Sequence, residues 1–376
     1  MKKLASAALV LSLLALPAVA VAGAPEVEAG GAVLMEKETG AVLFEDHAHD
    51  KLEPASVTKV MTLLLVMEAI DDGRLSPDEL VTVSAHAASM GGSQVYLKEN
   101  EQMTVRDLVK AVTVVSGNDA AVALAEHLCG SEEGFVAKMN ERAAQLGMAD
   151  TTFLNCTGLP AAGHLTSAYD IAVMSRQLLI HPAIREYATI WMDSIRDGAF
   201  QLSNTNKLIR FYPGATGLKT GSTDSAGYCL SATAERDGME LIAVVLKSPT
   251  SEKRFEGAKS LLNFGFANYT LLDVYPNQAL PPIDVLLGKQ GQVQPELSAS
   301  SRILVEKEQV NQVTTDIRLC QDVEAPVEQG QVLGHMAVLV NGEERQSIPI
   351  TASEAVGRIS APGIFFRFLQ ELFMAA

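Results

Sequence analysis

Two residues at the start of an apolar stretch could act together as a nucleophile and its base. Ser56 and Lys59 are three positions apart, and the apolar run Val60 to Met67 follows them. Residues three apart share one face of a helix, so the Lys59 ammonium is expected near the Ser56 hydroxyl. A serine hydroxyl is a weak nucleophile until a base removes its proton, and a lysine with a lowered pKa can be that base. The pair therefore predicts serine-based nucleophilic chemistry, whereas its alternative is a helix that merely starts with a surface lysine.

The helix that must position this pair is predicted to be buried. Val60 to Met67 is apolar on nearly every face, and Asp71-Asp72-Gly73 ends the run. A helix that is apolar all round lies in a core. We therefore expect Ser56 and Lys59 on the first turn of a core helix, where free backbone N–H groups add positive potential.

Two further polar motifs follow in chain order. Ser116-Gly117-Asn118 comes after apolar residues with helical spacing between Val105 and Val115, for which Thr104 is a plausible N-cap. Lys219-Thr220-Gly221 comes before two strand-like runs, 228–234 and 239–246, which predict an antiparallel pair. Ser116 can relay a proton and Asn118 can hold a substrate amide. Lys219 supplies positive charge, and Gly221 lets a substrate strand approach a sheet edge closely.

Taken in order, S-x-x-K, S-D-N and K-T-G are typical of penicillin-binding proteins and class A β-lactamases. In this chain Gly117 replaces the aspartate of the second motif, and its outer Ser and Asn are kept. The chain resembles the serine-type D-alanyl-D-alanine carboxypeptidases of peptidase family S11, the low-molecular-mass penicillin-binding proteins of bacteria. The resemblance covers essentially the whole mature chain. The segments that carry it are Pro54 to Thr62, Ser116 to Ala120, Phe153 to Leu159, His164 to Asp170, Asn204 to Leu208 and Gly217 to Thr223.

The resemblance implies an α+β fold of the β-lactamase/DD-peptidase type, with helices packed on a five-stranded antiparallel sheet and a small all-β domain behind it. The chain divides accordingly. We expect a signal peptide at 1–22, a DD-peptidase domain at 23–272, a β-rich domain at 273–360 and an amphipathic membrane-anchoring helix at 361–376.

The N-terminus has the organisation of a secretory signal. Lys2-Lys3 precedes the apolar stretch Leu4 to Leu16, and small-residue cleavage sites end at Ala20 and Ala22. The stretch is too short to span a membrane, and the alternative is an uncleaved anchor. We therefore expect an exported protein, peripheral on the outer face of the bacterial cytoplasmic membrane or secreted.

The C-terminal third has a different texture. Short β-branched runs begin near residue 275, and Asn341-Gly342 is a strong hairpin signal. In the last segment, Ile364 to Met374, Arg367, Gln370 and Glu371 fall on one helical face and apolar residues cover the rest. This pattern predicts a helix lying in the membrane interface, and its alternative is a helix docked on the β domain.

Composition excludes few functions. The chain has 376 residues, 48% of them hydrophobic, and a net charge of −16, which argues against a nucleic-acid partner. The spacing of its four cysteines matches no zinc pattern, and no metal or organic cofactor is indicated. We expect buried free thiols rather than disulfides at these positions, which are Cys129, Cys156, Cys229 and Cys320.

The resemblance also implies residue roles. Ser56 would attack the carbonyl between two D-alanines of a peptidoglycan stem peptide, with Lys59 or a Lys219–Ser116 relay as base. Backbone N–H groups of Ser56 and Ser222 would form the oxyanion hole, and β-lactams would trap the acyl-enzyme. The predicted catalytic residues are Ser56, Lys59 and Ser116, and the predicted substrate-binding residues are Asn118, Lys219, Thr220, Gly221 and Ser222.

Two positions depart from related enzymes. Thr205 stands where some relatives carry an arginine for the terminal carboxylate, and Arg210 nearby has no assigned role. Thr151 stands where class A β-lactamases have their deacylating glutamate, so a fast β-lactamase is not expected. A DD-endopeptidase acting on crosslinks and a catalytically silent penicillin-binding sensor remain alternative functions. Trp191 is interpreted as a packing residue rather than a sugar platform.

Overall fold

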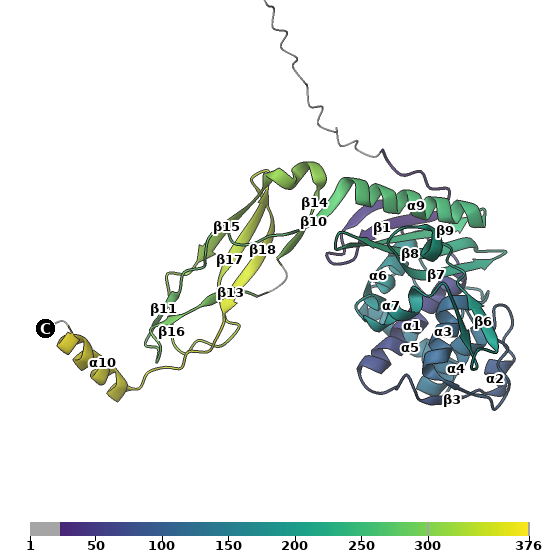
Figure 1. Cartoon of the computed structure of the whole chain (residues 1–376), viewed down its shortest axis with the longest axis horizontal. Helices are drawn as coiled ribbons and strands as arrows, with labels where there is room; N and C mark the ends of the chain where they lie inside the picture. Colours follow the sequence, from purple (N-terminus) through teal and green to yellow (C-terminus); the bar gives the residue numbers. More distant parts are fainter. Residues whose placement is uncertain (1–22, 299–300, 375–376) are drawn as a thin grey trace, which may run out of the picture.

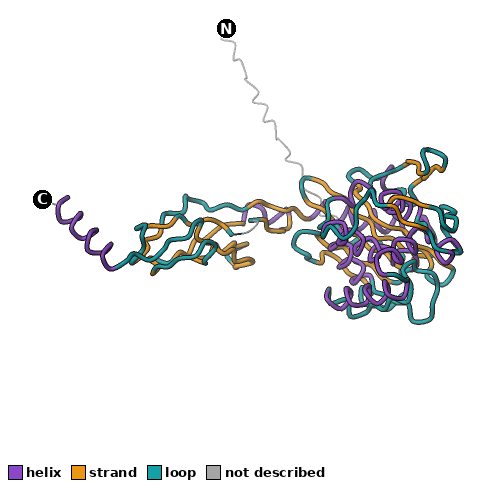
Figure 2. Tube along the Cα trace, turned by 90° about the horizontal axis from the view of Figure 1, so that it is seen from below, coloured by secondary structure: helices purple, strands orange, loops and turns teal. Residues whose placement is uncertain are grey.

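The computed structural model describes residues 23–298 and 301–374, and it shows two parts in a row with a helix at the far end (Figure 1). A broad part in which helices surround a sheet is called the mixed domain here. A slender part made almost entirely of strands follows it and is called the β domain (Figure 2). The predicted signal peptide, 1–22, lies outside the described residues.

A five-stranded antiparallel sheet forms the centre of the mixed domain, as predicted. Its strand order is β2-β1-β9-β8-β7, so β7 is one edge. The strands β7 and β8 pair antiparallel, and Lys219 of the K-T-G motif lies opposite Ser231. The strands are β1 (Gly31–Glu36), β2 (Val42–Asp46), β7 (Ala215–Thr223), β8 (Gly227–Arg236) and β9 (Met239–Ser248).

Helices cover both faces of this sheet. Helix α9 (Ser251–Asn268) packs on one face, where Phe255, Leu261 and Leu262 share a core with the strands. The larger helical layer on the other face encloses the main hydrophobic core (Figure 1). Its helices are α1 (Lys59–Asp71), α2 (Ala85–Ala88), α3 (Val105–Val115), α4 (Asn118–Cys129), α5 (Glu132–Gln145), α6 (Ala168–Leu178) and α7 (Ala183–Ala188).

Helix α1 is the buried helix that the apolar run predicts. All but a few of its side chains are buried, including Lys59 at its first position. Ser56 does not lie in the α-helix itself. It lies one step earlier, in the 3-10 turn η1 (Ala55–Thr58), which leads directly into α1.

The second motif lies where α3 meets α4. Thr104 caps α3 as predicted, because its hydroxyl accepts a hydrogen bond from the backbone N–H of Asp107 at 3.2 Å. Ser116 then takes a left-handed conformation, with φ 65° and ψ 31°. The cap of α4 is Gly117, which has no side chain to bond the helix.

Short elements complete the mixed domain. Two hairpins and one short helix connect the longer elements, and the helix contacts the edge strand β7. The hairpin strands are β3 (Leu80–Thr82) with β4 (Gln102–Thr104) and β5 (Met192–Ile195) with β6 (Phe200–Ser203), and the helix is α8 (Leu208–Phe211).

The β domain starts without a break, because α9 runs directly into β10 (Tyr269–Asp273). At the predicted hairpin, Asn341 and Gly342 both have positive φ and join β17 to β18. Two small hydrophobic clusters form the cores of this domain. Its other elements are β11 (Ile283–Leu286), β12 (Gln292–Val293), β13 (Pro295–Leu297), β14 (Arg302–Glu306), η2 (Lys307–Gln312), β15 (Val313–Leu319), β16 (Asp322–Glu324), β17 (Val332–Val340) and β18 (Glu343–Ala352).

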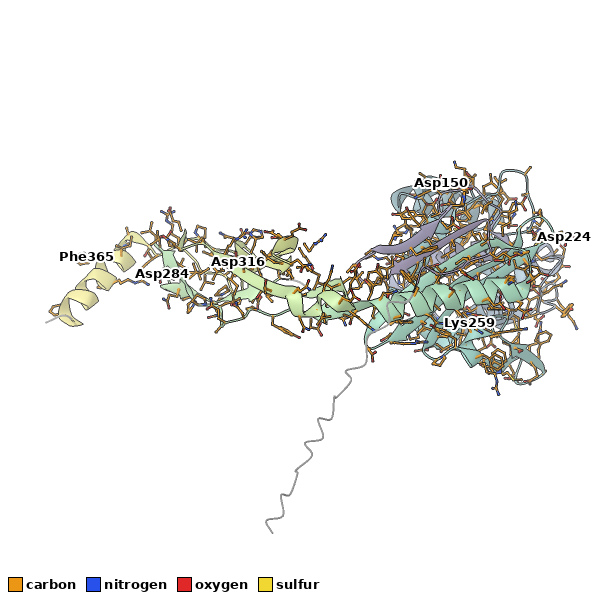
Figure 3. The ribbon with its side chains drawn as sticks, turned by 90° about the horizontal axis from the view of Figure 1, so that it is seen from above. Asp150, Asp224, Lys259, Asp284, Asp316 and Phe365 are labelled. Carbon is orange, nitrogen blue, oxygen red and sulfur yellow. The ribbon has the colours of Figure 1, made fainter. Side chains whose placement is uncertain are left out.

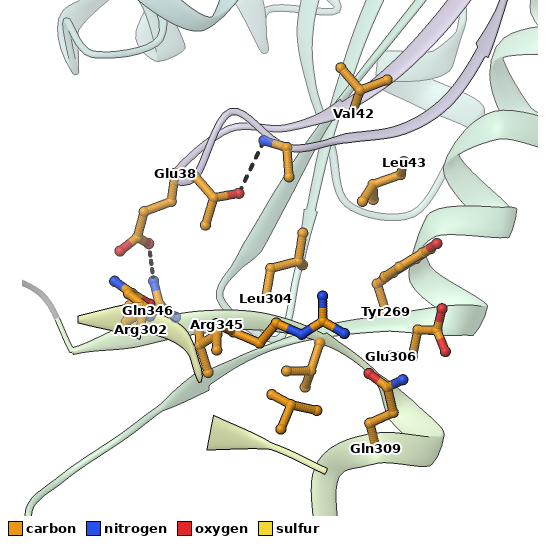
Figure 4. Close-up of a pocket in the computed structure, with 15 residues that line it drawn as sticks. Glu38, Val42, Leu43, Tyr269, Arg302, Leu304, Glu306, Gln309, Arg345 and Gln346 are labelled. Carbon is orange, nitrogen blue, oxygen red and sulfur yellow. Dashed lines mark hydrogen bonds and ion pairs between the residues drawn. The ribbon is translucent and has the colours of Figure 1, made fainter. Parts of the chain in front are cut away.

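The two domains meet at a groove of about 700 Å³ (Figure 4). The β1–β2 hairpin lines one side and β14 lines the other. Across the junction, Arg302 donates a hydrogen bond to the Glu38 carboxylate at 2.7 Å and another to the Gly238 carbonyl at 3.2 Å. Lys307 donates to the Phe266 carbonyl at 2.6 Å. These contacts tie the near end of the β domain to the mixed domain.

Helix α10 (Ala361–Met374) projects from the opposite end of the β domain. Figure 3 shows Phe365 at the end of the molecule most distant from Asp224 of the mixed domain. The side chains of Phe365, Phe366 and Phe373 are 60%, 66% and 77% exposed. Within residues 23–298 and 301–374, no helix is long and apolar enough to cross a membrane.

All four cysteines are free thiols. Cys156 and Cys229 are buried, as expected, but Cys129 and Cys320 are exposed. The expectation of buried positions was therefore wrong for two of the four, which lie at a helix end and after a strand of the β domain.

Candidate active site

Three separate segments bring the predicted residues together. The turn η1 and the first residue of α1 carry Ser56 and Lys59, the α3–α4 junction carries Ser116 and Asn118, and the edge strand β7 carries the K-T-G motif. The turn η1 packs directly against β7. The sheet edge and the buried helix therefore hold the three motifs on one site.

Lys59 is fully buried and has three polar partners. Its Nζ lies 3.0 Å from Ser56 Oγ, 2.6 Å from Asn118 Oδ1 and 2.6 Å from the Thr157 carbonyl oxygen. Burial lowers the pKa of Lys59 from 10.5 to about 7, although nearby Cys156 and Asp119 act in the opposite direction. Desolvation disfavours the charged form of a lysine. The neutral amine is therefore accessible near pH 7.

The geometry then assigns the proton between Ser56 and Lys59. A neutral amine has two N–H bonds and one lone pair, and the two oxygens of Asn118 and Thr157 can only accept. They take the two N–H bonds, so the lone pair faces the third partner, the Ser56 hydroxyl. In this state the Ser56 hydroxyl donates a hydrogen bond to Lys59 Nζ and keeps its proton until it attacks, which is the arrangement that general-base activation of a nucleophile needs.

Ser116 has a buried hydroxyl with nothing bound to it. Its side chain is 4% exposed, and in the described part of the chain its Oγ has no hydrogen-bond partner. A buried polar atom without a partner costs free energy, and such atoms are few in folded proteins. The hydroxyl is thus free to form a hydrogen bond with a substrate or to relay a proton.

Asn118 uses its side chain largely within the protein. While Oδ1 accepts from Lys59, Nδ2 donates to the Gly91 carbonyl at 2.6 Å. Its backbone N–H donates to the Ser93 carbonyl at 2.7 Å. One N–H of Nδ2 is left for a substrate amide, so Asn118 has a second role that the sequence did not suggest: it orients Lys59.

Lys219 is also buried, with 1% of its surface exposed. Its Nζ donates to the Thr220 carbonyl at 2.8 Å. Burial, and then the positive charges of Lys59 and Arg254, hold the pKa of Lys219 well below its usual value. Next to it, the hydroxyls of Thr220 and Thr205 lie 2.6 Å apart. The position that differs from arginine-bearing relatives therefore lies directly at the K-T-G motif.

The need for glycine at position 221 comes from the close approach of the protein's own backbone. A Cβ at this position would lie 2.8 Å from Ser56 N, 2.9 Å from Val57 N and 3.0 Å from the Pro54 carbonyl oxygen. No real side chain fits such distances without a shift of η1. The expected reason for this glycine, close approach of a substrate strand, is thus replaced by close approach of the nucleophile's own turn. Ser222, the next residue, is exposed beside it.

The loop 153–159, one of the segments that carry the family resemblance, has a role at the site that the sequence analysis did not assign. Its Thr157 carbonyl binds Lys59, and its Asn155 side chain accepts from the backbone N–H groups of Thr157 and Gly158. A Cβ on Gly158 would lie 1.9 Å from the Ala55 carbonyl oxygen, so this glycine allows the loop to pack on η1. The Asn-x-Thr-Gly pattern signals a turn, but nothing in the sequence marks a backbone carbonyl as a ligand of lysine.

Arg254 is a second residue that was not foreseen. It lies in α9 with 7% of its surface exposed and donates through Nη1 to the carbonyls of Gly221 and Cys229, at 3.0 and 3.2 Å. Burial lowers the pKa of Arg254 to about 10. Its charge therefore lies behind β7, close to Lys219.

The remaining singled-out residues lie in ordinary structural settings. Thr151 donates to the Asp170 carboxylate at 2.7 Å. Arg210 lies over the rings of Trp191 and Phe211, 5.8 Å from each centroid, and those rings meet edge to face at 6.0 Å. Trp191 is therefore packed in an aromatic cluster, in agreement with the packing interpretation.

Comparisons with known proteins agree with this geometry. A family model described as D-alanyl-D-alanine carboxypeptidase matches residues 18–250, and one for the C-terminal domain of penicillin-binding protein 5 matches residues 274–358. The D-alanyl-D-alanine carboxypeptidase DacF of Bacillus subtilis is 43% identical over 332 residues, covering 87% of this chain and 85% of its own. The carboxypeptidase DacC of Escherichia coli is 34% identical over 342 residues, covering 89% and 85%.

Solved structures show the same likeness. The crystal structure of penicillin-binding protein 5 from Haemophilus influenzae superposes with a TM-score of 0.78 at 30% identity, covering 90% of this chain and all of that one. Penicillin-binding protein D2 of Listeria monocytogenes, in its ampicillin-bound form, superposes with a TM-score of 0.59 at 36% identity. That match covers 64% of this chain and 98% of the other.

Proposed function

The chain belongs to the D-alanyl-D-alanine carboxypeptidase family of penicillin-binding serine peptidases, and from this premise we propose that it removes the terminal D-alanine of peptidoglycan stem peptides through an acyl-enzyme on Ser56. The observation that carries the assignment is the contact between Ser56 Oγ and Lys59 Nζ, 3.0 Å, at a lysine with a pKa of about 7. A nucleophile with a base in hydrogen-bond reach is the arrangement that acyl transfer requires.

The acylation step follows from this contact. Ser56 Oγ attacks the carbonyl carbon between the two D-alanines and passes its proton to neutral Lys59. The oxyanion that forms accepts hydrogen bonds from the backbone N–H groups of Ser56 and Ser222. Ser56 N lies against Gly221, the residue before Ser222, which supports this pairing of donors. Collapse expels D-alanine, whose amine takes a proton, and water then releases the acyl group from Ser56.

Ser116 and Lys219 serve the protons and the substrate carboxylate. The free hydroxyl of Ser116 can pass a proton to the leaving amine. Lys219 can meet the terminal carboxylate as a cation, because an anion beside it would offset the burial that lowers its pKa. The hydroxyls of Thr220 and Thr205 bond each other, which leaves one O–H of the pair as a donor in place of an arginine. Lys59 is the better-supported base, since it is the lysine bonded to Ser56.

The protein acts at the outer face of the membrane in this proposal, exported by its N-terminal segment and attached through α10. The rings of Phe365, Phe366 and Phe373 support attachment, because most of their surface is exposed to solvent. Phosphatidylcholine vesicles should co-sediment with the mature chain and not with a variant carrying Phe365→Ser and Phe366→Ser. Equal co-sedimentation of both proteins would remove α10 as the attachment.

The activity is tested with a pentapeptide ending in D-Ala-D-Ala. Wild-type protein should release D-alanine, and Ser56→Ala should release none. Ser89→Ala is a matched control, since Ser89 is exposed on the same domain and its hydroxyl donates to the His86 carbonyl at 2.8 Å. Release by Ser56→Ala at the wild-type rate would refute the assignment of the nucleophile.

A further inference from the structure

The loop that supplies the Thr157 carbonyl is held in place by a neighbouring helix. Its Cys156 backbone N–H donates to Glu132 Oε1 at 3.1 Å, and its Cys156 carbonyl accepts from the Thr62 hydroxyl at 2.7 Å. Glu132 is the first residue of α5, and Thr62 lies on α1. The peptide immediately before Thr157 is therefore fixed from both sides.

Glu132 makes a second contact that fixes its own carboxylate. Oε2 lies 2.9 Å from Nε2 of His86 on α2, while Oε1 also receives the Cys156 thiol at 3.3 Å. The side chain of Glu132 is only 15% exposed. Both oxygens are therefore committed, one to His86 and one to the loop.

We propose that Glu132 is a positioning residue for the catalytic lysine, holding the loop 155–158 so that the Thr157 carbonyl takes one N–H of Lys59. The proposal rests on the role of Lys59 in the proposed function. If the carbonyl is displaced, Lys59 can turn its lone pair away from Ser56. The base is then misdirected, although no residue that touches the substrate has changed.

The neighbouring Glu133 distinguishes this role from a general effect of acidic residues on the helix start. Carboxylates in the first turn of a helix stabilise it through the helix dipole. Glu132 and Glu133 both occupy that turn of α5. Glu133 is exposed, however, and only Glu132 bonds the loop. A change specific to Glu132 therefore reports on the loop.

The pH profile of acylation gives a readout that a loss of stability alone would not move. A carbonyl bonded to Lys59 favours its ammonium form, so displacing Thr157 lowers the pKa of Lys59 further. The charged or titratable groups that face Lys59 are Asp119 and Cys156, with Lys219 across the site. Those that face the Glu132–His86 pair are Glu126, Glu133 and Cys156. The acid limb of the acylation profile should therefore move to lower pH when the loop is released.

The experiment measures acylation of the full mature chain by ampicillin between pH 5 and 8 for Glu132→Ala, Glu132→Gln and Glu133→Ala. Glu132→Ala should lower the acylation rate constant about tenfold or more, since a displacement of ~1 Å in a catalytic group can cost about 100-fold. Its non-covalent affinity for ampicillin should stay unchanged, and its acid limb should move to lower pH. Glu132→Gln keeps an oxygen acceptor for Cys156 and should recover most of the rate.

Two results would overturn the proposal. One is an acylation rate constant for Glu132→Ala within about twofold of that for Glu133→Ala. Such a difference is much smaller than the decrease expected from a misplaced base. The other is an equal loss in Glu132→Ala and Glu132→Gln with an unmoved acid limb, which would indicate a structural role alone. Either result leaves the proposed function standing if wild-type Ser56 is acylated. Failure of the wild type to acylate would overturn both.

Discussion

Lowering the pH should stop acylation of Ser56, and the burial of Lys59 sets the pH range in which this happens. With a pKa of about 7, about half of Lys59 is neutral at pH 7, about a tenth at pH 6 and about a hundredth at pH 5. A lysine with its ordinary pKa of 10.5 would be neutral in only about three molecules in 10,000 at pH 7. Burial therefore raises the fraction of competent base by about a thousandfold.

The acylation rate should rise with pH because the lowered pKa belongs to the base. Because the base must be neutral, the acylation rate rises with pH through the lowered pKa of Lys59 and levels above it. The rate constant for acylation by a fluorescent penicillin, measured by stopped flow between pH 5 and 9, should fall about tenfold per pH unit below pH 6. A Lys219→Met variant, measured alongside, should keep this acid limb even if substrate binding weakens.

Three outcomes would refute the reasoning in different ways. A flat profile from pH 5 to 8 would mean that no group with this pKa limits acylation. A rate that still rises about tenfold per pH unit up to pH 9 would mean that burial does not lower the pKa of Lys59. Loss of the limb in Lys219→Met would transfer the role of base to Lys219 and its relay through Ser116.

Further predictions follow from single residues of the site and from the thiols. Gly221→Ala should lower the free energy of unfolding by about 1–3 kcal/mol and slow acylation, because the new Cβ would lie 2.8 Å from Ser56 N and push the turn η1 away. Urea titration measures the first effect and stopped flow the second, and unchanged acylation would contradict the packing argument. Ser116→Ala removes a hydroxyl without a partner in the described chain. It should leave the free energy of unfolding within about 0.5 kcal/mol and lower D-alanine release about 100-fold, whereas unchanged release would exclude the relay. Ellman's reagent should titrate Cys129 and Cys320 in the native protein and Cys156 and Cys229 only after unfolding. Cys129 should react more slowly than an ordinary exposed thiol, because burial raises its pKa, and four fast thiols in the native state would contradict this assignment.

Much of the fold could be predicted because its signals are local. The apolar run after Lys59 specifies a buried helix without reference to any other segment, and Thr104 marks a helix start through its own hydroxyl. Asn341 and Gly342 define their hairpin by the positive φ that those residue types tolerate. The five-stranded sheet came instead from family resemblance, because its order joins β1 to β9 across most of the domain.

The parts of the site that escaped prediction are those made by backbone atoms of distant segments. The Thr157 carbonyl reaches Lys59 from 98 positions away, and any residue type has such a carbonyl. Gly221 was correctly singled out, but for an approach by substrate, since the sequence does not show that η1 lies against β7. The Asp119 carboxylate is a similar case, because it accepts from the backbone N–H groups of Val95 and Leu97, 24 and 22 positions away.

The most direct test of the account is to find where a β-lactam attaches. Mass spectrometry of the mature protein after incubation with ampicillin, followed by peptide mapping, should show one adduct per chain. We expect this adduct on Ser56, bonded through Oγ, and we expect none in Ser56→Ala. An adduct on another residue, or none in a correctly folded sample, would contradict the central claim that Ser56 is the nucleophile and Lys59 its base.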